Sequence, residues 1–265
     1  AGHRFHTKSD TECIVHAYEE YGPSAVERLD GMFAFVIYDG RRQEIFAARD
    51  RLGKKPFFYT LRNGTFLFAS ELSAIVEHPA AAAAVSRRSL KKYFAYGYIP
   101  APNTLYEGIH KLPGGHSLRF DVASQRIEIH KYWDFVIEPF ESVPANAEQE
   151  WGERLVELLS AAVKRRLMGD VPLGFFLSGG VDSSSVVALA ARHIDRSLIH
   201  TFSIGFEEAS FDESRYSAEM AQHLGTHHHL DVLSLEKAAA LLPDVASKLD
   251  EPMGDASLLP TYLLC

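Results

Sequence analysis

The feature that most constrains this fold is a glycine–serine loop that joins an apolar segment to a helical one. The loop reads Leu177-Ser-Gly-Gly-Val-Asp-Ser-Ser184, follows the apolar residues 171–177 and runs into a helical pattern over 182–193. Its glycines permit a tight turn that points backbone N–H groups inward, and the positive end of the helix favours an anion there. Because the loop carries no lysine, it is not the mononucleotide loop that ends in Gly-Lys-Ser or Gly-Lys-Thr. The pattern predicts a phosphate-binding turn between a buried strand and a helix.

The chain around this loop alternates between helical and strand patterns. Gly225 is placed as the stop of one helix, and Pro243 predicts an interruption in the last one. The patterns predict helices over 151–167, 182–193, 212–224 and 234–249 and strands over 171–177, 200–206 and 227–232. Helices and strands in alternation form a parallel sheet with helices on both faces. We therefore expect a Rossmann-like α/β domain, incomplete because doubly wound sheets usually have about five or six strands.

The first half of the chain instead has the pattern of paired antiparallel strands. Asp39-Gly40 and Asn63-Gly64 each stand between two short apolar runs, which is typical of a β-hairpin. Strands are predicted over 32–38, 44–48, 56–60, 65–69, 116–120 and 126–130, with helices over 71–77 and 89–95. Residues 136–149 then lose all periodicity and carry two prolines, as segments between domains often do. We predict an α+β domain over 1–135, a linker over 136–149 and an α/β domain over 150–265.

Composition argues against several classes of protein. The 265 residues are 46% hydrophobic and 23% charged, close to the globular average. The formal net charge of −8 argues against unspecific nucleic-acid binding. No apolar run approaches the roughly 20 residues of a membrane span, and no signal peptide is visible. Cys13 and Cys265 form neither a disulfide framework nor a metal-ligand spacing. We expect a cytoplasmic protein that binds neither nucleic acid nor a membrane.

Several stretches together resemble one family. Ser178-Gly-Gly-Val-Asp-Ser-Ser184 resembles the pyrophosphate-binding loop of the ATP pyrophosphatases, which adenylate a substrate and release pyrophosphate. Residues 9–12, 29–35 and 48–56 resemble consecutive parts of the class II glutamine amidotransferase domain of asparagine synthetase B, and further matches follow in the family's order over 201–206, 211–214, 223–226 and 250–262. The resemblance implies an α+β first domain with Ntn-hydrolase-like antiparallel αββα layers, followed by an α/β ATP-pyrophosphatase domain. Both domains are expected to be incomplete.

The resemblance also implies roles for individual residues. Asp10 would hold the α-amino group of glutamine, although the sequence fits a capping role on a helix from Thr11 to Tyr21 equally well. ATP and Mg²⁺ would bind at Phe176, Leu177, Ser178, Gly179, Gly180, Val181, Asp182, Ser183, Ser184 and Ile204. Within this set Phe176 or Leu177 would frame adenine together with Ile204, for which ordinary core is the alternative, and Asp182 would be the metal ligand. Contacts to substrate or Mg²⁺ would come from Asp182, Asp250, Glu251, Asp255 and Ser257, and a solvated loop is the alternative for the last four.

The triplet His227-His228-His229 could indicate a metal site. In a strand, the first and third histidines share one face. A closed metal site needs further ligands, which the sequence does not place. We therefore favour a strand without metal over these residues.

The function that the resemblance implies is glutamine-dependent asparagine synthesis. Glutamine hydrolysis would supply ammonia, ATP would adenylate the β-carboxylate of aspartate, and the amide would form with release of AMP and pyrophosphate. The N-terminal cysteine nucleophile of the family is absent from this chain, which starts at Ala1, and Cys13 has no free amine to serve as base. The later acidic catalytic residue would follow Cys265. We expect the chain alone to catalyse neither step, and the full-length protein to be a homodimer that takes glutamine, aspartate and ATP.

Two other functions fit the same residues. The first is a β-lactam synthetase-like or peptide-modifying ATP-dependent cyclase whose glutaminase domain is not catalytic. The second is a non-catalytic fragment that binds a nucleotide. The residue after the initiator methionine would separate the first alternative from asparagine synthesis, because any residue except cysteine removes the glutaminase activity.

Overall fold

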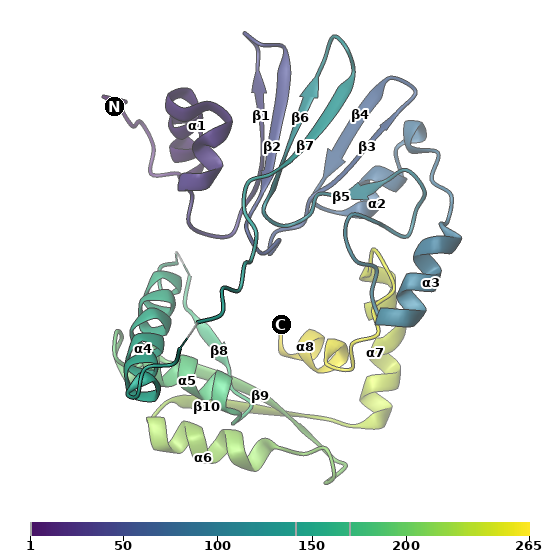
Figure 1. Ribbon diagram of the computed structural model, residues 1–265. Coiled ribbons are helices and arrows are strands. Elements are labelled where there is room, and N and C mark those ends of the chain that lie inside the picture. Colours follow the sequence, from purple (N-terminus) through teal and green to yellow (C-terminus); the bar gives the residue numbers. More distant parts are fainter. Residues whose placement is uncertain (1, 141, 170) are drawn as a thin grey trace. The chain divides into compact units, whose positions relative to one another are not determined.

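The computed structural model describes residues 2–140, 142–169 and 171–265, and the chain forms two compact units (Figure 1). Unit 1 consists of Ala1–Ile137 and Leu249–Gly254, and unit 2 of Glu138–Lys248 and Asp255–Cys265. The sequence predicts 150–265 as one domain, whereas Leu249–Gly254 packs with unit 1. Ala1 and Glu141, the latter in the predicted linker, lie outside the described residues.

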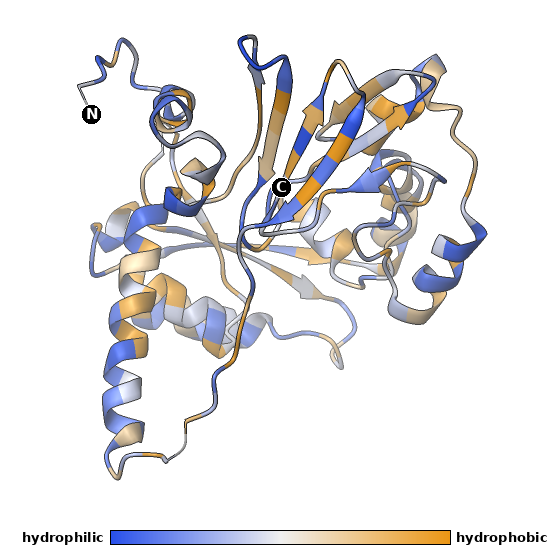
Figure 2. Cartoon of the chain, turned by 45° about the horizontal axis from the view of Figure 1, so that its top comes forward, coloured by the Kyte–Doolittle hydropathy of each residue, from blue (hydrophilic) through white to orange (hydrophobic). Residues whose placement is uncertain are grey.

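Unit 1 is built on antiparallel sheets, as its hairpin signals predict. One sheet has the order β1-β2-β6-β7, with β1 at Ala34–Asp39, β2 at Glu44–Arg49, β6 at His116–Asp121 and β7 at Arg126–Lys131. The other has the order β4-β3-β5, with β4 at Thr65–Ala69, β3 at Phe58–Arg62 and β5 at His110–Lys111. Asn63 and Gly64 both have positive φ, 50° and 75°, which is the geometry of a tight hairpin turn. In Figure 2 hydrophilic and hydrophobic residues alternate along the start of β7, as expected for a strand with two unlike faces.

Helices pack on these sheets through alternating strand residues. Helix α1, Asp10–Tyr21, contributes Tyr18 to a cluster with Phe46 and Ala48 of β2. Between them, Ala47 points to the opposite face and packs with Tyr59 and other residues around the second sheet. Phe58 of β3 packs in turn with the short helix α2, Leu72–Val76. The remaining helical segments of unit 1 are the 3₁₀ turns Gly22–Arg28 and Pro79–Ala81 and helix α3, Arg87–Tyr96.

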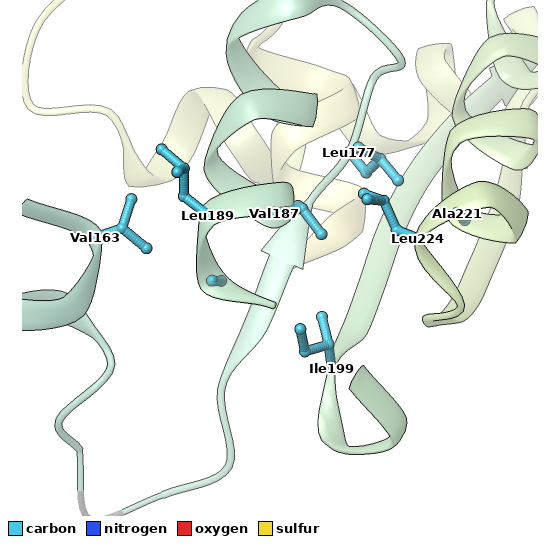
Figure 3. Close-up of a cluster of buried hydrophobic side chains, with 8 residues drawn as sticks. Val163, Leu177, Val187, Leu189, Ile199, Ala221 and Leu224 are labelled. Carbon is cyan, nitrogen blue, oxygen red and sulfur yellow. The ribbon is translucent and has the colours of Figure 1, made fainter. Parts of the chain in front are cut away.

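Unit 2 contains a parallel sheet of order β10-β9-β8, with strands β8 at Gly174–Phe176, β9 at His200–Phe206 and β10 at His227–Leu233. The helices are α4 at Ala147–Arg166, α5 at Val181–Ala190, α6 at Ser214–Leu224, α7 at Leu235–Lys248 and α8 at Leu258–Leu264, with a 3₁₀ turn at Arg196–Leu198. The core gathers residues of α4, α5 and α6 around Leu177 and Ile199 (Figure 3). Parallel strands joined by helices confirm the predicted α/β class.

Several predicted elements of unit 2 differ from the structure. Helix α4 begins at Ala147, inside the predicted linker, and β8 is shorter than the predicted strand over 171–177. The predicted interruption at Pro243 is wrong, because α7 continues through it. A proline removes one helical hydrogen bond, and Val245, which is buried two residues later, anchors the helix beyond that point. Among the described residues, no helix combines the length and the apolarity needed to cross a membrane.

Candidate functional site

The loop that follows β8 is held in shape by its own serines. The Leu177 N–H donates to the Phe202 carbonyl at 2.9 Å, which extends the pairing of β8 with β9 by one residue. The hydroxyls of Ser178 and Ser183 lie 3.0 Å apart, and the Ser183 hydroxyl also accepts the Ser178 N–H at 3.2 Å. Gly180 donates its N–H to the Ser178 hydroxyl at 3.3 Å. The loop therefore keeps its curvature before any ligand binds.

Gly179 is required at the tightest point of this loop. Its φ is +81°, in the left-handed region, and a Cβ built there would lie 2.6 Å from two carbon atoms of Tyr216. Tyr216 belongs to α6, so that helix packs directly against the loop. Any side chain larger than a hydrogen atom is excluded at position 179, both by the backbone conformation and by this contact. Sequence reasoning missed the part played by Tyr216, because no local signal links it to the loop.

The start of α5 presents unused backbone donors. The first helical bond runs from the Ser184 N–H to the Gly180 carbonyl at 3.0 Å, so the N–H groups of Val181, Asp182 and Ser183 precede the helical ladder. Val181 is 83% exposed, so this end of the helix is open to solvent. The Ser184 hydroxyl is buried and has no hydrogen-bond partner among the described residues. This donor set, at the positive end of a helix, fits a phosphate chain.

Two of the three predicted adenine-framing side chains are accessible. Phe176 is 54% exposed and Ile204 is half-buried, whereas Leu177 is 1% exposed and packs in the core of unit 2. Phe176 pairs with Phe202 across the sheet, and Ile204 follows two residues later on β9, so Phe176 and Ile204 share a face. The side chain of Leu177 points to the other face. The face of an adenine ring could therefore pack against Phe176 and Ile204, whereas the buried Leu177 side chain offers no surface for it.

Asp182 supplies the carboxylate of this loop. It lies in the first turn of α5 and is exposed. A carboxylate beside phosphate donors is the type of ligand that Mg²⁺ prefers. Its position fits the predicted metal role.

Asp10 lies in unit 1, at the first residue of α1. The alternative of a capping Asp10 is wrong, because Ser9 is the N-cap and its hydroxyl accepts the Thr11 N–H at 3.2 Å. Glu12 is also occupied, since its carboxylate accepts the Thr7 hydroxyl and the N–H groups of His6 and Thr7, and these bonds lower its pKa. The Asp10 carboxylate is exposed and lines a groove of about 460 Å³ together with residues 11, 14–15, 32–37, 55–56 and 70. Its one hydrogen bond among the described residues, with the Thr11 hydroxyl at 3.5 Å, is long, so the exposed Asp10 carboxylate can still bind an ammonium group.

One wall of this groove depends on a half-buried arginine. The Arg49 guanidinium donates to the carbonyls of Lys55, Gly53 and Leu112 at 2.6–2.7 Å. Asp50 accepts the N–H groups of Lys54 and Lys55, both at 2.9 Å. Together these bonds fix the loop that places Lys55 and Pro56 beside Asp10. The sequence singled out residues 48–56 only through a resemblance and gave no role to Arg49 or Asp50.

The four acidic and hydroxyl residues near the C-terminus do not form one cluster. Asp250 and Glu251 belong to unit 1, where their carboxylates bind other parts of that unit. Asp255 belongs to unit 2 and accepts both the N–H and the hydroxyl of Ser257 at 2.8 Å, which lowers its pKa. The structure places Asp250 and Glu251 in unit 1, with protein partners on both carboxylates, and Asp255 and Ser257 in unit 2, so it does not bring the four residues into one cluster.

The histidine triplet is divided between the faces of β10. His228 lies between the hydroxyls of Thr201 and Ser203, at 3.0 and 3.1 Å, and burial lowers its pKa. On the other face, His229 is 3.0 Å from a ring nitrogen of His200. Within the described residues, the one grouping of three potential metal ligands is His3, His16 and Glu19 on unit 1. The triplet is not part of any such grouping.

The comparisons with known proteins match two successive parts of the chain to two domain families. Residues 1–133 match the domain family described as glutamine amidotransferase domain, and residues 154–265 match the one described as asparagine synthase. A relative from Methanocaldococcus jannaschii is 37% identical, over 97% of this chain and 49% of its own length.

The chain is also similar to two further curated relatives and to one solved structure. Asparagine synthetase (glutamine-hydrolyzing) 3 of Bacillus subtilis is 37% identical over 97% of this chain and 44% of its own length. Amidase chry2 of Gibberella zeae is 31% identical over 95% and 39%. The structure of glutamine phosphoribosylpyrophosphate amidotransferase from B. subtilis matches 86% of this chain and 40% of its own at 15% identity, with a TM-score of 0.36.

The chain spans about half the length of the curated relatives that it matches. Its first half matches a glutamine amidotransferase domain, and its second half carries the Ser178–Ser184 loop inside the asparagine synthase match. The chain belongs to the family in which a glutamine amidotransferase domain is followed by an asparagine synthase domain.

Proposed function

We propose that the full-length protein makes asparagine from aspartate, with ATP as the activating substrate and glutamine as the nitrogen donor. The observation that carries this proposal is the phosphate-binding geometry of residues 178–184 within a chain whose first unit also offers the Asp10 groove. Family membership supports the pairing of the two chemistries. Because the chain is about half of its relatives, the complete reaction belongs to the longer protein.

In unit 1, Asp10 would bind the α-amino group of glutamine. The carboxylate is exposed and is not taken up by helix capping, which Ser9 performs. A charge-assisted hydrogen bond from an ammonium group to a carboxylate is both short and selective. We assign unit 1 to the Ntn-hydrolase-like αββα fold, on the packing of α1, the two sheets and α2.

In unit 2, the loop would hold the phosphates of ATP. The N–H groups of Val181, Asp182 and Ser183 and the hydroxyl of Ser178 would donate to phosphate oxygens, and Phe176 and Ile204 would contact adenine. Asp182 would hold Mg²⁺, which supplies neutralisation of the phosphate charge. Donors that are already oriented stabilise the developing charge on pyrophosphate as the aspartate carboxylate attacks the α-phosphate. Asp255 and Ser257 remain candidates for contacts to substrate.

ATP–pyrophosphate exchange by the full-length protein tests this proposal. We expect exchange to depend on aspartate, and Ser178→Ala and Asp182→Asn each to lower it by at least about 100-fold. Asp195→Asn is the matched control, because Asp195 is an exposed aspartate of the same unit that caps the turn at Arg196–Leu198. Exchange that survives Asp182→Asn would refute the loop assignment. Exchange without need of aspartate would refute asparagine synthesis and leave adenylation standing.

A second function is favoured by one of the relatives. The Gibberella zeae protein is named an amidase, at 31% identity over 95% of this chain. The loop would serve an enzyme that forms an amide on another carboxylate equally well, including a cyclase without glutaminase activity. Exchange assayed with a panel of carboxylic acids separates these acceptors. ATP binding without any exchange would indicate the non-catalytic alternative.

Two finer assignments accompany the proposal. We place the protein in the cytoplasm, which fits its two cysteines, both free. We also expect the full-length protein to be a homodimer, which sedimentation analysis would test.

A further inference from the structure

Residues Leu249–Gly254 form a strap, the name used here for this segment, which is fixed to unit 1 although the chain on both sides of it belongs to unit 2. Its first anchor is Asp250. The Asp250 carboxylate accepts the N–H groups of Leu72 and Ser73 at 2.5 and 3.1 Å. Those are the first two residues of α2, whose own N-cap, Glu71, makes no capping bond. A residue 178 positions away in sequence therefore caps this helix.

The second anchor is Glu251. Its carboxylate accepts the Leu105 N–H at 2.6 Å and pairs with the Lys111 ammonium at 2.5 Å. The pair is shielded, with side-chain exposures of 17% for Lys111 and 13% for Glu251. Lys111 also donates to the Ile99 carbonyl at 2.6 Å. Shielded, multiply bonded ion pairs hold their geometry far better than exposed ones.

The third anchor is a close approach of two glycines. The Gly254 N–H donates to the Gly97 carbonyl at 2.7 Å, and a Cβ on Gly254 would lie 3.3 Å from the Gly97 Cα. Gly97 has a φ of +75° at the C-terminal end of α3. The strap is thus bound along its length by side chains at its start and by backbone at its end.

Each side-chain anchor is linked to the Asp10 groove through neighbouring residues of unit 1. Ser70 lines the groove and stands two positions before Leu72, which Asp250 caps. Pro56 also lines it and stands two positions before Phe58, the β3 residue that pairs with Lys111. A ligand that orders Pro56 or Ser70 therefore acts on the elements that hold the strap.

The ends of the strap are fixed in unit 2. Before it, Lys248 of α7 donates to Asp244 at 2.6 Å and to the hydroxyl of Tyr262 on α8 at 2.5 Å. The Tyr262 hydroxyl also donates to Asp244. After the strap, Asp255 caps the residues that lead into α8. On one side of the strap, Lys248 is therefore fixed to α7 and α8, and on the other side Asp255 is fixed to Ser257.

We propose that Asp250 and Glu251 are positioning residues that couple glutamine binding at the Asp10 groove to synthesis in unit 2. The strap is seated, in the sense used here, when the bonds of Asp250 and Glu251 to unit 1 are formed. The coupling acts through this seated state. The inference rests on the proposed function of the groove. Coupling between two equilibria is reciprocal, so a seated strap raises the affinity for glutamine by the factor by which glutamine stabilises the seated strap.

The test compares nitrogen donors in the full-length protein. With Asp250→Ala or Glu251→Ala, we expect asparagine formation from glutamine to fall about tenfold, the loss of about 1.4 kcal/mol of coupling, and formation from ammonium salts to stay within twofold. Glu44→Gln is the matched control, because it breaks the 2.5 Å ion pair with Arg119 in unit 1 without touching the strap. Asp250→Asn keeps one acceptor oxygen and should restore part of the coupling.

If the strap only stabilises the fold and does not couple the two activities, we expect a different result. An equal fall with both nitrogen donors, or no change with either, would overturn the proposal. Hydrogen exchange at the Leu72, Ser73 and Leu105 amides gives a readout without catalysis. Glutamine should slow this exchange in the wild type, slow it less in Asp250→Asn and leave it unchanged in Asp250→Ala. Glutamine without effect on these amides would also overturn the coupling. A wild-type protein that makes no asparagine from either donor would refute the proposed function instead. The hydrogen-exchange measurement would still decide whether glutamine binding and the strap are coupled.

Discussion

The two candidate sites of this chain are built in opposite ways. The phosphate loop of unit 2 is one continuous stretch, Ser178–Ser184, held by hydrogen bonds among its own serines. The groove of unit 1 gathers Asp10 with residues from several distant segments, and its wall near Lys55 is fixed by Arg49. A continuous site depends on local geometry, whereas a dispersed site depends on framework bonds outside it. The first should therefore fail through changes within the loop, and the second through changes away from the ligand.

The largest expected effect is that of Gly179→Ala. The added Cβ would lie 2.6 Å from backbone and side-chain carbons of Tyr216, at a φ of +81°. We expect ATP affinity to fall at least about 100-fold and unit 2 to lose about 2–4 kcal/mol of stability, because both strain and overlap are introduced. Nucleotide titration and urea unfolding measure the two effects.

Gly225→Ala is the control for this change. Gly225 also has a positive φ, +71°, but nothing lies within 4 Å of its built Cβ. We expect a cost of about 1 kcal/mol from the left-handed backbone alone, with ATP affinity unchanged. Equal losses in the two variants would show that the loop does not depend on its contact with Tyr216.

The dispersed site should respond to Arg49→Met. This change leaves the carbonyls of Lys55, Gly53 and Leu112 without their donor. We expect unit 1 to lose about 3 kcal/mol and the KM for glutamine of the full-length protein to rise, although Arg49 itself is not among the groove-lining residues. Arg51→Ala is the adjacent control, since Arg51 makes one exposed bond of 3.4 Å to the Glu27 carbonyl. A glutamine KM that does not move in Arg49→Met would contradict the framework argument.

Ser9 and Asp10 separate folding from binding at neighbouring positions. Ser9→Ala removes the N-cap of α1 and should cost about 1 kcal/mol without changing glutamine affinity. Asp10→Asn should instead lower glutamine affinity about tenfold or more, by weakening a charge-assisted bond, at nearly unchanged stability. Calorimetric titration of the full-length protein and thermal unfolding distinguish the two variants. The reverse pattern would return Asp10 to a structural role.

The same contrast explains what the sequence could predict. Ser178–Ser184 was predictable because its glycines, serines and following helix are adjacent in the chain, and the hairpin at Asn63-Gly64 was predictable because those residues favour positive φ. The capping role of Ser9 could not be separated from one for Asp10, since both residue types cap helices. The partners of Asp250 and Glu251 were out of reach, because a carboxylate that caps a helix 178 positions away leaves no local pattern. The continuation of α7 through Pro243 likewise depends on tertiary packing at Val245.

The smallest expected effect on stability comes from His228. Its ring lies 3.5 Å from the hydroxyl of Ser217, on the helix that packs against the phosphate loop, but it takes no part in the loop. Burial lowers its pKa below 6.5 in the folded state, so below pH 6.5 the unfolded chain binds a proton that the folded chain does not. The stability of unit 2 should therefore be full above pH 6.5 and fall as the pH drops towards the folded-state pKa, with a slope of at most about 1.4 kcal/mol per pH unit for one proton. His228→Gln should flatten this dependence, because glutamine can keep a bond to Ser203 or Thr201 without titrating. Urea unfolding followed by Trp151 fluorescence in a Trp133→Phe background reports unit 2 alone, since the chain has two tryptophans. An unchanged slope in His228→Gln would mean that other titratable groups of unit 2 cause its loss of stability in acid.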